Sequence, residues 1–296
     1  MANGSVYLLV SITAFFWGAN FVLGGFVLED MPPLWAAAIR FALAVLLMLI
    51  IVSFRREPVF APLRQHASTY AMLGVVGIVA FNLLFFYALT ETSANNAALI
   101  MATNPLLTTM IAAMVLGERP GMRHFVALPV ALIGVTVVIT HGRLDDLLAL
   151  HFSAGDVLML AANIFWALYN VLCRRYMPQA SPWVNITWIM AAGTAVLLLV
   201  ALASGESFVL PGSTAGWSVA VMAIGGTVLA YLFWNAGIAK LGAARTSIFL
   251  NLVPVFAMLL GAIVAASPTA AQLAGGLLVL VGVSIAMSPP RKLLPA

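Results

Sequence analysis

The sequence predicts an all-α membrane protein in which ten transmembrane helices form two five-helix repeats of opposite orientation. Three observations lead to this fold class. Of the 296 residues, 64% are hydrophobic and only 7% are charged, whereas a soluble domain carries a far larger charged fraction. The apolar residues form long continuous runs, which cross a bilayer as helices because a helix satisfies its own backbone hydrogen bonds. The third observation is an internal repeat that relates the two halves of the chain.

Each apolar run predicts one helix, and short connections separate the runs. The connections contain Gly, Pro and charged residues, which favour turns, and none is long enough to hold a second domain. In chain order, the clearest are Glu29–Pro33, Arg55–Pro58, Gly117–Gly121, His141–Arg143, Pro178–Pro182 and Ser204–Glu206. The ten predicted spans are residues 5–28, 33–53, 68–89, 93–116, 122–140, 153–173, 181–203, 214–238, 243–265 and 269–288.

The distribution of Lys and Arg predicts how these spans are oriented in the cell (inner) membrane. Basic residues are enriched in cytoplasmic loops. With a cytoplasmic N-terminus, Arg143 is outside, Arg40 lies within the second span, and the other 11 of the 13 basic residues are cytoplasmic. We therefore expect a multi-pass protein whose two termini are both cytoplasmic. The 11 residues are Arg55, Arg56, Arg64, Arg119, Arg123, Arg174, Arg175, Lys240, Arg245, Arg291 and Lys292.

A constant offset relates the two halves of the chain. Phe16-Trp17 returns as Phe165-Trp166, and 166 − 17 = 149. Because five spans is an odd number, the second repeat enters the membrane upside down. We expect the repeats at residues 1–145 and 150–290, and inverted repeats are typical of secondary transporters with a substrate site near the midplane. The same offset aligns Pro33 with Pro182, Gly77 with Gly226, Leu83 with Leu232, Ala94 with Ala243, and Pro105 with Pro254.

Two tryptophans at matching depth in the first and sixth spans, Trp17 and Trp166, predict a cavity lined from both repeats. Trp normally lies at the membrane interface, where its N–H group stays hydrated. Nearby amides and rings add uncharged hydrogen-bonding groups and apolar walls, which suit a neutral or zwitterionic substrate. The alternative is that the rings fill a bundle core and the amides join helices at about 0.6 kcal/mol each. The candidate substrate-binding residues are Trp17, Asn20, Asn82, Phe86, Met101, Asn163, Trp166, Tyr169, Tyr231 and Trp234.

Prolines near the middle of the fourth and ninth spans, Pro105 and Pro254, predict helix kinks. Proline frees the carbonyl four residues earlier, which either faces the cavity or is satisfied by nearby hydroxyls in a static kink. Arg40 is the one cation clearly within a span. We interpret it as a structural or gating residue that reaches the headgroups or Asp30, with capture of a substrate carboxylate as the alternative. Glu118 is expected to anchor a helix end.

Missing motifs exclude several classes of function. The sequence has no Gly-x-x-x-x-Gly-Lys-Ser/Thr run for ATP, and no His-Glu-x-x-His or Gly-x-Ser-x-Gly motif for hydrolysis. The single Cys173 and four scattered His residues predict no metal site, so we expect neither a cofactor nor an enzyme. The basic residues form no stripe that would bind nucleic acid. No carboxylate lies at the midplane of a span, so we expect facilitated export or coupling through an unidentified group.

Three stretches carry a family resemblance. Residues 33–41 resemble the second-helix motif of the EamA-like family of the drug/metabolite transporter superfamily. Residues 94–119, with Asn104-Pro105-Leu106, and residues 243–282, with Pro254, are similar to the same family. The resemblance implies a ten-helix, five-plus-five inverted repeat that exports metabolites, with helices one, three, four, six, eight and nine around a central cavity. Ser267 stands in place of Glu118 and Ile189 in place of Arg40 in the second repeat, so a symmetric role for these charges is not implied.

Within this superfamily, the chain is most similar to amino-acid exporters, including those for aromatic amino acids. The alternatives are a multidrug or other metabolite efflux carrier of the same superfamily, a non-saturable channel and a non-transporting scaffold. A pump for hydrophobic cations needs a buried acid, and the first span has only Glu29 at its outer end. The expected partners are a small-molecule substrate and the lipid bilayer, and the expected assembly is a monomer or a weak dimer.

Overall fold

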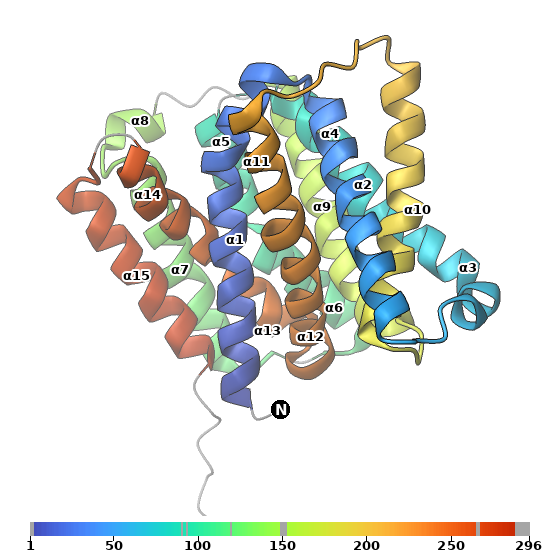
Figure 1. The fold of residues 1–296 in the computed structure, drawn as a ribbon. Coiled ribbons are helices and arrows are strands. Elements are labelled where there is room, and N and C mark those ends of the chain that lie inside the picture. Colours follow the sequence, from blue (N-terminus) through green and yellow to red (C-terminus); the bar gives the residue numbers. More distant parts are fainter. Residues whose placement is uncertain are drawn as a thin grey trace, which may run out of the picture.

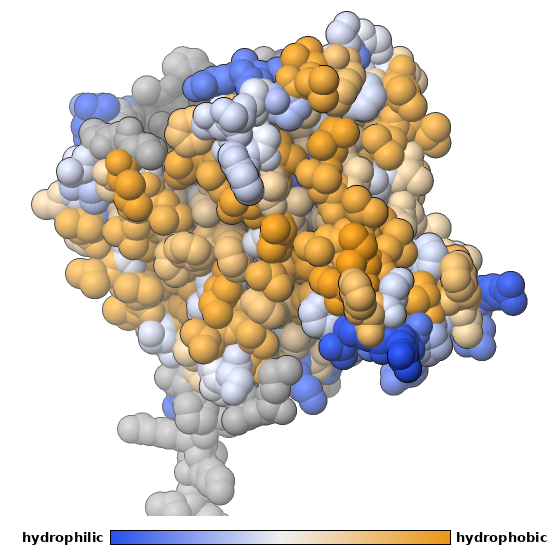
Figure 2. Space-filling view, in the orientation of Figure 1, coloured by the Kyte–Doolittle hydropathy of each residue, from blue (hydrophilic) through white to orange (hydrophobic). Residues whose placement is uncertain are grey.

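The computed structural model describes residues 3–89, 91–92, 94–118, 120–148, 153–264 and 267–287. Within these residues there is no strand, and ten helices are long and apolar enough to cross a membrane. The helices pack side by side into one bundle (Figure 1). Apolar side chains cover the middle of the bundle and hydrophilic ones gather toward its two ends (Figure 2), as in a protein surrounded by lipid. The predicted fold class is confirmed.

Most spans begin and end within a few residues of their predicted positions. The first repeat contains α1 (Asn3–Asp30), α2 (Pro33–Phe54), α3 (Phe60–Gly74) with the π-helix η1 (Val75–Ala80) and α4 (Phe81–Leu89), α5 (Ala94–Ala102) with α6 (Asn104–Leu116), α7 (Met122–Ile139), and the short α8 (Leu144–Leu148). The second contains α9 (Ala154–Tyr176), α10 (Pro182–Ala203), α11 (Ser213–Val221) with the π-helix η2 (Met222–Leu229) and α12 (Ala230–Leu241), α13 (Ala243–Ser247) with the 3₁₀-helix η3 (Ile248–Asn251) and α14 (Leu252–Val264), and α15 (Ala270–Met287).

The helix ends follow from local sequence signals. Pro33 and Pro182 occupy the first turns of α2 and α10, where a missing backbone donor costs nothing. Ser153 and Asp156 form a capping box at the start of α9, in which the N–H of each residue donates to the side chain of the other, at 2.7 and 3.3 Å. Gly117 ends α6 with a φ of 66°, a conformation that glycine adopts without a steric penalty.

The third span starts earlier than predicted, at Phe60 instead of residue 68. Polar residues between Arg64 and Thr69 gave this segment the composition of a connection. The chain is nevertheless helical there, with one break at His66, where φ is −130° and ψ is 23°. Figure 1 shows the first turns of α3 projecting from the lower right of the bundle, so the extra turns lie beside the bundle and leave its interior unchanged.

The two repeats are intertwined. Helix α1 packs against α12 and α14 of the second repeat, and α9 packs against α4 and α6 of the first. Equivalent helices also pair with each other, α2 with α10 and α7 with α15, on opposite sides of the bundle (Figure 1). In the α7–α15 pair, a Cβ on Gly134 would lie 2.7 Å from the carbonyl oxygen of Gly275, so these helices approach as closely as small residues allow. This reciprocal packing places the first span of each repeat at the centre.

Candidate functional site

A cavity of about 490 Å³ lies among the central helices. Its lining residues in α1 run from Trp17 to Leu28, so it occupies the half of the bundle away from the N-terminus. Helices α1, α2, α4, α5, α9, α11, η2, α12, η3 and α14 all contribute to its wall. Compared with the arrangement that the resemblance implies, the additional member is α2, which supplies Ala36, Ala37 and Arg40. The cavity is therefore lined from both repeats.

Six of the ten candidate residues line this cavity, three do not, and the side chain of one is not described. Asn163, Tyr169 and Trp234 are fully buried outside its lining. Phe86 belongs to α4, but its side chain lies outside the described residues. Pro254 also lines the cavity, whereas Pro105 does not. The six candidates that line it are Trp17, Asn20, Asn82, Met101, Trp166 and Tyr231.

The two tryptophans of the repeat meet at the end of the cavity nearest the middle of the bundle. The ring centroids of Trp17 and Trp166 are 5.4 Å apart with an angle of 76° between the ring planes, an edge-to-face arrangement that aromatic pairs favour. Trp17 donates its Nε1–H to the carbonyl of Gly226 at 3.0 Å, so its polar group is satisfied. The rings of Phe81 and Tyr231 lie 5.2 and 5.9 Å from that of Trp166, which makes this end of the cavity aromatic.

A packed layer lies behind this aromatic end, toward the N-terminus of α1. Trp166 stacks on Tyr169 at 5.2 Å, and the Tyr169 hydroxyl accepts a hydrogen bond from Asn235 at 3.0 Å. Trp234 donates its Nε1–H to Asn170 at 2.8 Å. Each of these four side chains makes at least one hydrogen bond, but Asn170 Nδ2 and Asn235 Oδ1 are buried without a partner among the described residues, so the layer is densely packed and only partly satisfied in this conformation. We call it the packed layer below.

The amide side chains differ in what they bind. Among the described residues, no hydrogen bond involves the side chain of Asn20, which faces the cavity. Asn82 donates to the carbonyl of Ile78 at 2.6 Å. Asn163 instead joins α9 to the break between α5 and α6, because its Nδ2 donates to the carbonyl of Ile100 at 2.6 Å and its Oδ1 accepts from Asn104 at 2.6 Å. Two amides therefore face the cavity while the third stabilises a helix break.

The two prolines that were predicted to kink the fourth and ninth spans, Pro105 and Pro254, follow breaks in their helices. Helix α5 ends at Ala102 and α6 begins at Asn104, so Pro105 lies in the first turn of the new helix. In the second repeat, α13 gives way to the 3₁₀-helix η3 before α14, which contains Pro254. Met101, just before the first break, and Leu250, within the 3₁₀-helix of the second, line the cavity, so backbone interruptions lie beside it at related positions of the two repeats.

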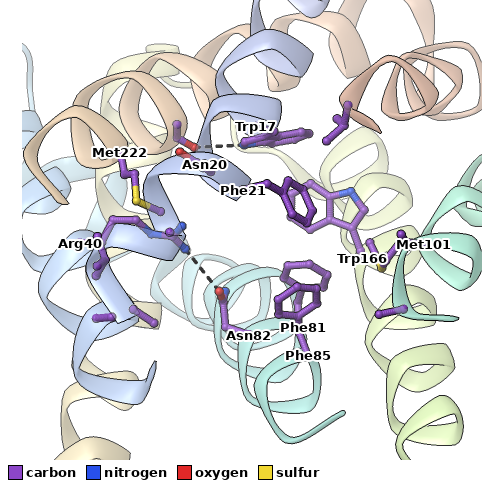
Figure 3. A pocket seen from close by; sticks show the side chains of 18 of the residues that line it. Trp17, Asn20, Phe21, Arg40, Phe81, Asn82, Phe85, Met101, Trp166 and Met222 are labelled. Atoms are coloured by element: carbon purple, nitrogen blue, oxygen red, sulfur yellow. Dashed lines mark hydrogen bonds between the residues drawn. The ribbon is translucent and has the colours of Figure 1, made fainter. Parts of the chain in front are cut away.

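Arg40 lies in the cavity wall. Its Nη2 is 3.4 Å from Asn82 Oδ1, and its Cζ is 4.9 Å from the ring centroid of Phe41. Asp30, the partner that we considered from the sequence, instead accepts the N–H of Gly212 at 2.9 Å. Figure 3 shows Arg40, Asn20 and Asn82 toward one side of the cavity, and the rings of Phe81, Phe85 and Trp166 toward the other.

Sequence reasoning missed several apolar wall residues, among them Phe81, Val219, Met222 and Val253. A signal existed for Phe81, because it lies four residues before Phe85, another aromatic residue of the third span, and residues at this spacing share a helix face. The two rings stack at 5.7 Å. Among the described residues, no group of three His, Cys, Asp or Glu side chains could hold a metal ion.

A bundle of two inverted repeats around a cavity near its middle defines a membrane transporter. The profile of the EamA-like transporter family matches residues 4–140 and again residues 153–288. The chain belongs to this family.

Known relatives are also named as transporters or efflux pumps. The uncharacterized transporter YyaM of Bacillus subtilis is 38% identical over 285 residues, which cover 96% of this chain and 93% of the relative. A Salmonella typhimurium protein named as a probable amino-acid metabolite efflux pump is 27% identical over 96% of this chain and 94% of its own length. A solved crystal structure matches with a TM-score of 0.78 at 20% identity, covering 96% of this chain and 98% of the other, and this match supports the fold alone.

Proposed function

We propose that this protein exports small neutral or zwitterionic metabolites, foremost amino acids with aromatic or apolar side chains, by alternating access through the central cavity. The observation that carries the proposal is the composition of the cavity wall. Trp17 and Trp166 supply ring faces for an apolar side chain, whereas Asn20 and Asn82 supply hydrogen-bonding groups for a polar backbone. The relative named as a probable amino-acid metabolite efflux pump supports the same class of substrate.

The proposal includes an orientation. The excess of Lys and Arg at the end of the bundle where α1 begins favours a cytoplasmic location for that end and for both termini in the inner membrane. The cavity then belongs to the outer half of the protein, and the packed layer separates it from the cytoplasm. In this arrangement the conformation is the one that releases substrate outside.

The residues of the packed layer take part in the other half of the cycle. When the repeats, residues 1–145 and 150–290, exchange their relative positions, the cavity closes outside and the layer opens inside. Tyr169 and Trp234 then face the substrate, while Asn163 keeps the break before Pro105 joined to α9. The helix breaks near Pro105 and Pro254 supply the bends that this movement needs. We propose a monomer or a weak dimer as the assembly, which light scattering of the purified protein measures.

Uptake of radiolabelled amino acids into proteoliposomes tests the proposal. A carrier gives saturable flux that unlabelled substrate competes, and the expected substrates are amino acids with apolar or aromatic side chains. Linear flux that does not saturate would identify a channel, and the absence of flux for all amino acids would contradict the proposal. Competition by hydrophobic cationic drugs instead of amino acids would identify the multidrug alternative, which the cavity disfavours because no carboxylate among the described residues lines it.

A further inference from the structure

Arg40 places a cation in the wall of the central cavity. It is the eighth residue of α2, and Ala36 and Ala37 lie one turn earlier on the same helix face. Their small side chains leave space beside the guanidinium group. Figure 3 shows this group reaching from α2 toward Asn82, with the rings of Phe81 and Trp166 beyond it. The cation therefore faces the place that a substrate occupies.

This guanidinium group has only weak, uncharged partners in the described part of the chain. A guanidinium carries five N–H donors. Its Nη2 makes one long bond of 3.4 Å to the neutral Asn82, and its Nε is buried without an acceptor. The ring of Phe41 beneath it compensates a buried charge only in part. No described carboxylate pairs with Arg40 or lines the cavity, so the wall carries one unpaired positive charge.

We propose that Arg40 binds the carboxylate of the transported molecule and that transport requires this carboxylate. The inference rests on the proposed function and narrows its substrate class. A carboxylate fits because its two oxygens accept two parallel N–H bonds from one guanidinium. The uncompensated charge favours anions and zwitterions over cations, and the rings opposite Arg40 hold an apolar body. The substrates are small apolar or aromatic carboxylates, which include amino acids and their deaminated analogues and exclude amino-acid amides and aromatic amines.

A matched ligand series isolates the carboxylate. Phenylalanine carries both charged groups, 3-phenylpropanoate lacks the ammonium group, and phenylalaninamide lacks the carboxylate; a second series is built on leucine. Each ligand competes with the labelled amino acid in proteoliposomes, and each is tested for its effect on the melting temperature of the purified chain in detergent. Ligands with a carboxylate compete and stabilise, whereas the amides compete about tenfold or more weakly, as loss of hydrogen bonds to a charged group predicts.

Variants of Arg40 test whether this side chain causes the preference for ligands with a carboxylate. Arg40→Gln removes the charge, and we expect phenylalanine to compete about 100-fold more weakly while phenylalaninamide is unchanged. Arg40→Lys retains the charge but loses the planar pair of donors, so a loss of about tenfold is expected. The matched control is Arg55→Gln. Arg55 lies at the exposed end of α2 and pairs with Glu57 at 3.2 Å, so its removal leaves the ligand series unchanged.

Asn82→Asp tests the same idea with Arg40 in place. The new carboxylate lies beside Arg40, where Asn82 Oδ1 is 3.4 Å from Nη2, and competes with that of the ligand. Carboxylate ligands then bind about tenfold more weakly although the protein remains folded, because an internal ion pair occupies the guanidinium. If the ranking of the ligands is unchanged in folded Asn82→Asp protein, the inference is overturned, because a carboxylate paired with Arg40 would then not affect carboxylate binding. This measurement remains possible if Arg40→Gln does not fold.

Three further results overturn the inference, and each is distinct from failure of the proposed function. Equal competition by phenylalanine and phenylalaninamide would show that the carboxylate is not recognised, although the protein remains an amino-acid carrier. A folded Arg40→Gln protein with the wild-type ranking would show that another group binds the carboxylate. Arg40-dependent stabilisation by phosphatidylglycerol, without stabilisation by 3-phenylpropanoate, would assign the cation to a lipid phosphate. If no amino acid is carried, the proposed function fails, and the stabilisation measurement in detergent still decides the role of Arg40.

Discussion

The half of the bundle around the cavity and the half that contains the packed layer are joined differently, although the same two repeats supply both. Around the cavity, small residues such as Gly24, Gly25 and Ala98 face open space. In the other half, the aromatic and amide side chains of the packed layer fill the space between the repeats. Polar contacts cross between the repeats at both ends: Gly212 donates to Asp30 at the cavity end and Arg175 donates to the carbonyl of Val115 at the other, each at 2.9 Å. Two repeats of related sequence therefore hold one end of the bundle closed and leave the other end open.

One position accounts for part of this difference. The carboxylate of Glu118, at the end of the fourth span, accepts the N–H groups of Ala243 and Ala244 at 3.3 and 3.4 Å, and Arg174 lies 3.9 Å from it. Glu118 thus joins the first repeat to the start of the ninth span. The related position is 118 + 149 = 267, which is Ser267 in this sequence. The closed end has a charged link where the open end has a hydroxyl group.

Loss of the Trp166 ring, which lies between the two halves, is expected to have the largest effect on transport. Trp166 contacts Trp17 on the cavity side and Tyr169 in the packed layer. We expect Trp166→Ala to lower amino-acid flux at least tenfold, because both conformations lose a wall for the substrate, and to cost about 3–5 kcal/mol of stability. Flux per folded molecule in proteoliposomes measures the first effect and thermal unfolding the second. The control is Trp217→Ala on the lipid-facing surface of α11, where Trp217 is 75% exposed; normal flux in Trp166→Ala would remove this ring from the site.

Removal of the Glu118 charge is expected to have an intermediate effect, which is a shift toward the state opened at this end of the bundle. Glu118→Gln weakens two charge-assisted hydrogen bonds, at about 1–2 kcal/mol in total, and so raises the population of the state opened at this end about 5- to 30-fold. The single cysteine, Cys173, is buried on α9 between the packed layer and this end and serves as a natural reporter. Its labelling rate by a thiol reagent rises in the variant by the same factor. Glu29→Gln, at the exposed opposite end of the bundle, is the control, and an unchanged rate in Glu118→Gln would show that another contact closes this end.

A change at a close contact beside the cavity is expected to have the smallest effect on transport. A Cβ on Gly226 would lie 2.2 Å from Asn20 Oδ1, so Gly226→Ala displaces the amide. We expect a loss of about 1–3 kcal/mol of stability from overpacking and a few-fold lower flux. Thermal unfolding and flux measure these changes. Gly216→Ala in the same span is the control, since its new Cβ meets no atom within 4 Å. A stability equal to the wild type in Gly226→Ala would mean that Asn20 moves without cost.

Much of the fold could be predicted because its signals depend only on the order of residues along the chain. Hydrophobic runs locate the spans, and the offset of the repeat pairs Trp17 with Trp166, whose rings meet at 5.4 Å in the structure. It is harder to predict how far along the bundle axis an inward-facing residue lies. Tyr169 shares a face with Trp166, but it lies three residues further along α9, a rise of about 4.5 Å. That rise is enough to move a side chain from the cavity into the packed layer.

The environment of Arg40 could not be predicted from the sequence. Its long side chain reaches several positions, and the position it takes depends on how closely α2 lies beside α4, which periodicity does not specify. Asp30 was the nearest acid in the sequence, yet its carboxylate accepts a hydrogen bond from the backbone N–H of Gly212 at 2.9 Å. The local signals at the helix ends were more informative, because the capping box of Ser153 and Asp156 depends only on neighbours in the chain.

The intertwined packing also constrains how this protein is made. Trp17 donates its N–H group to Gly226, which the ribosome adds 209 residues later. Helix α1 therefore waits in the bilayer, without the helices that bury it, until α12 and α14 are synthesised. A gene divided between the repeats would yield two fragments with incomplete interiors, and each would depend on the other to fold.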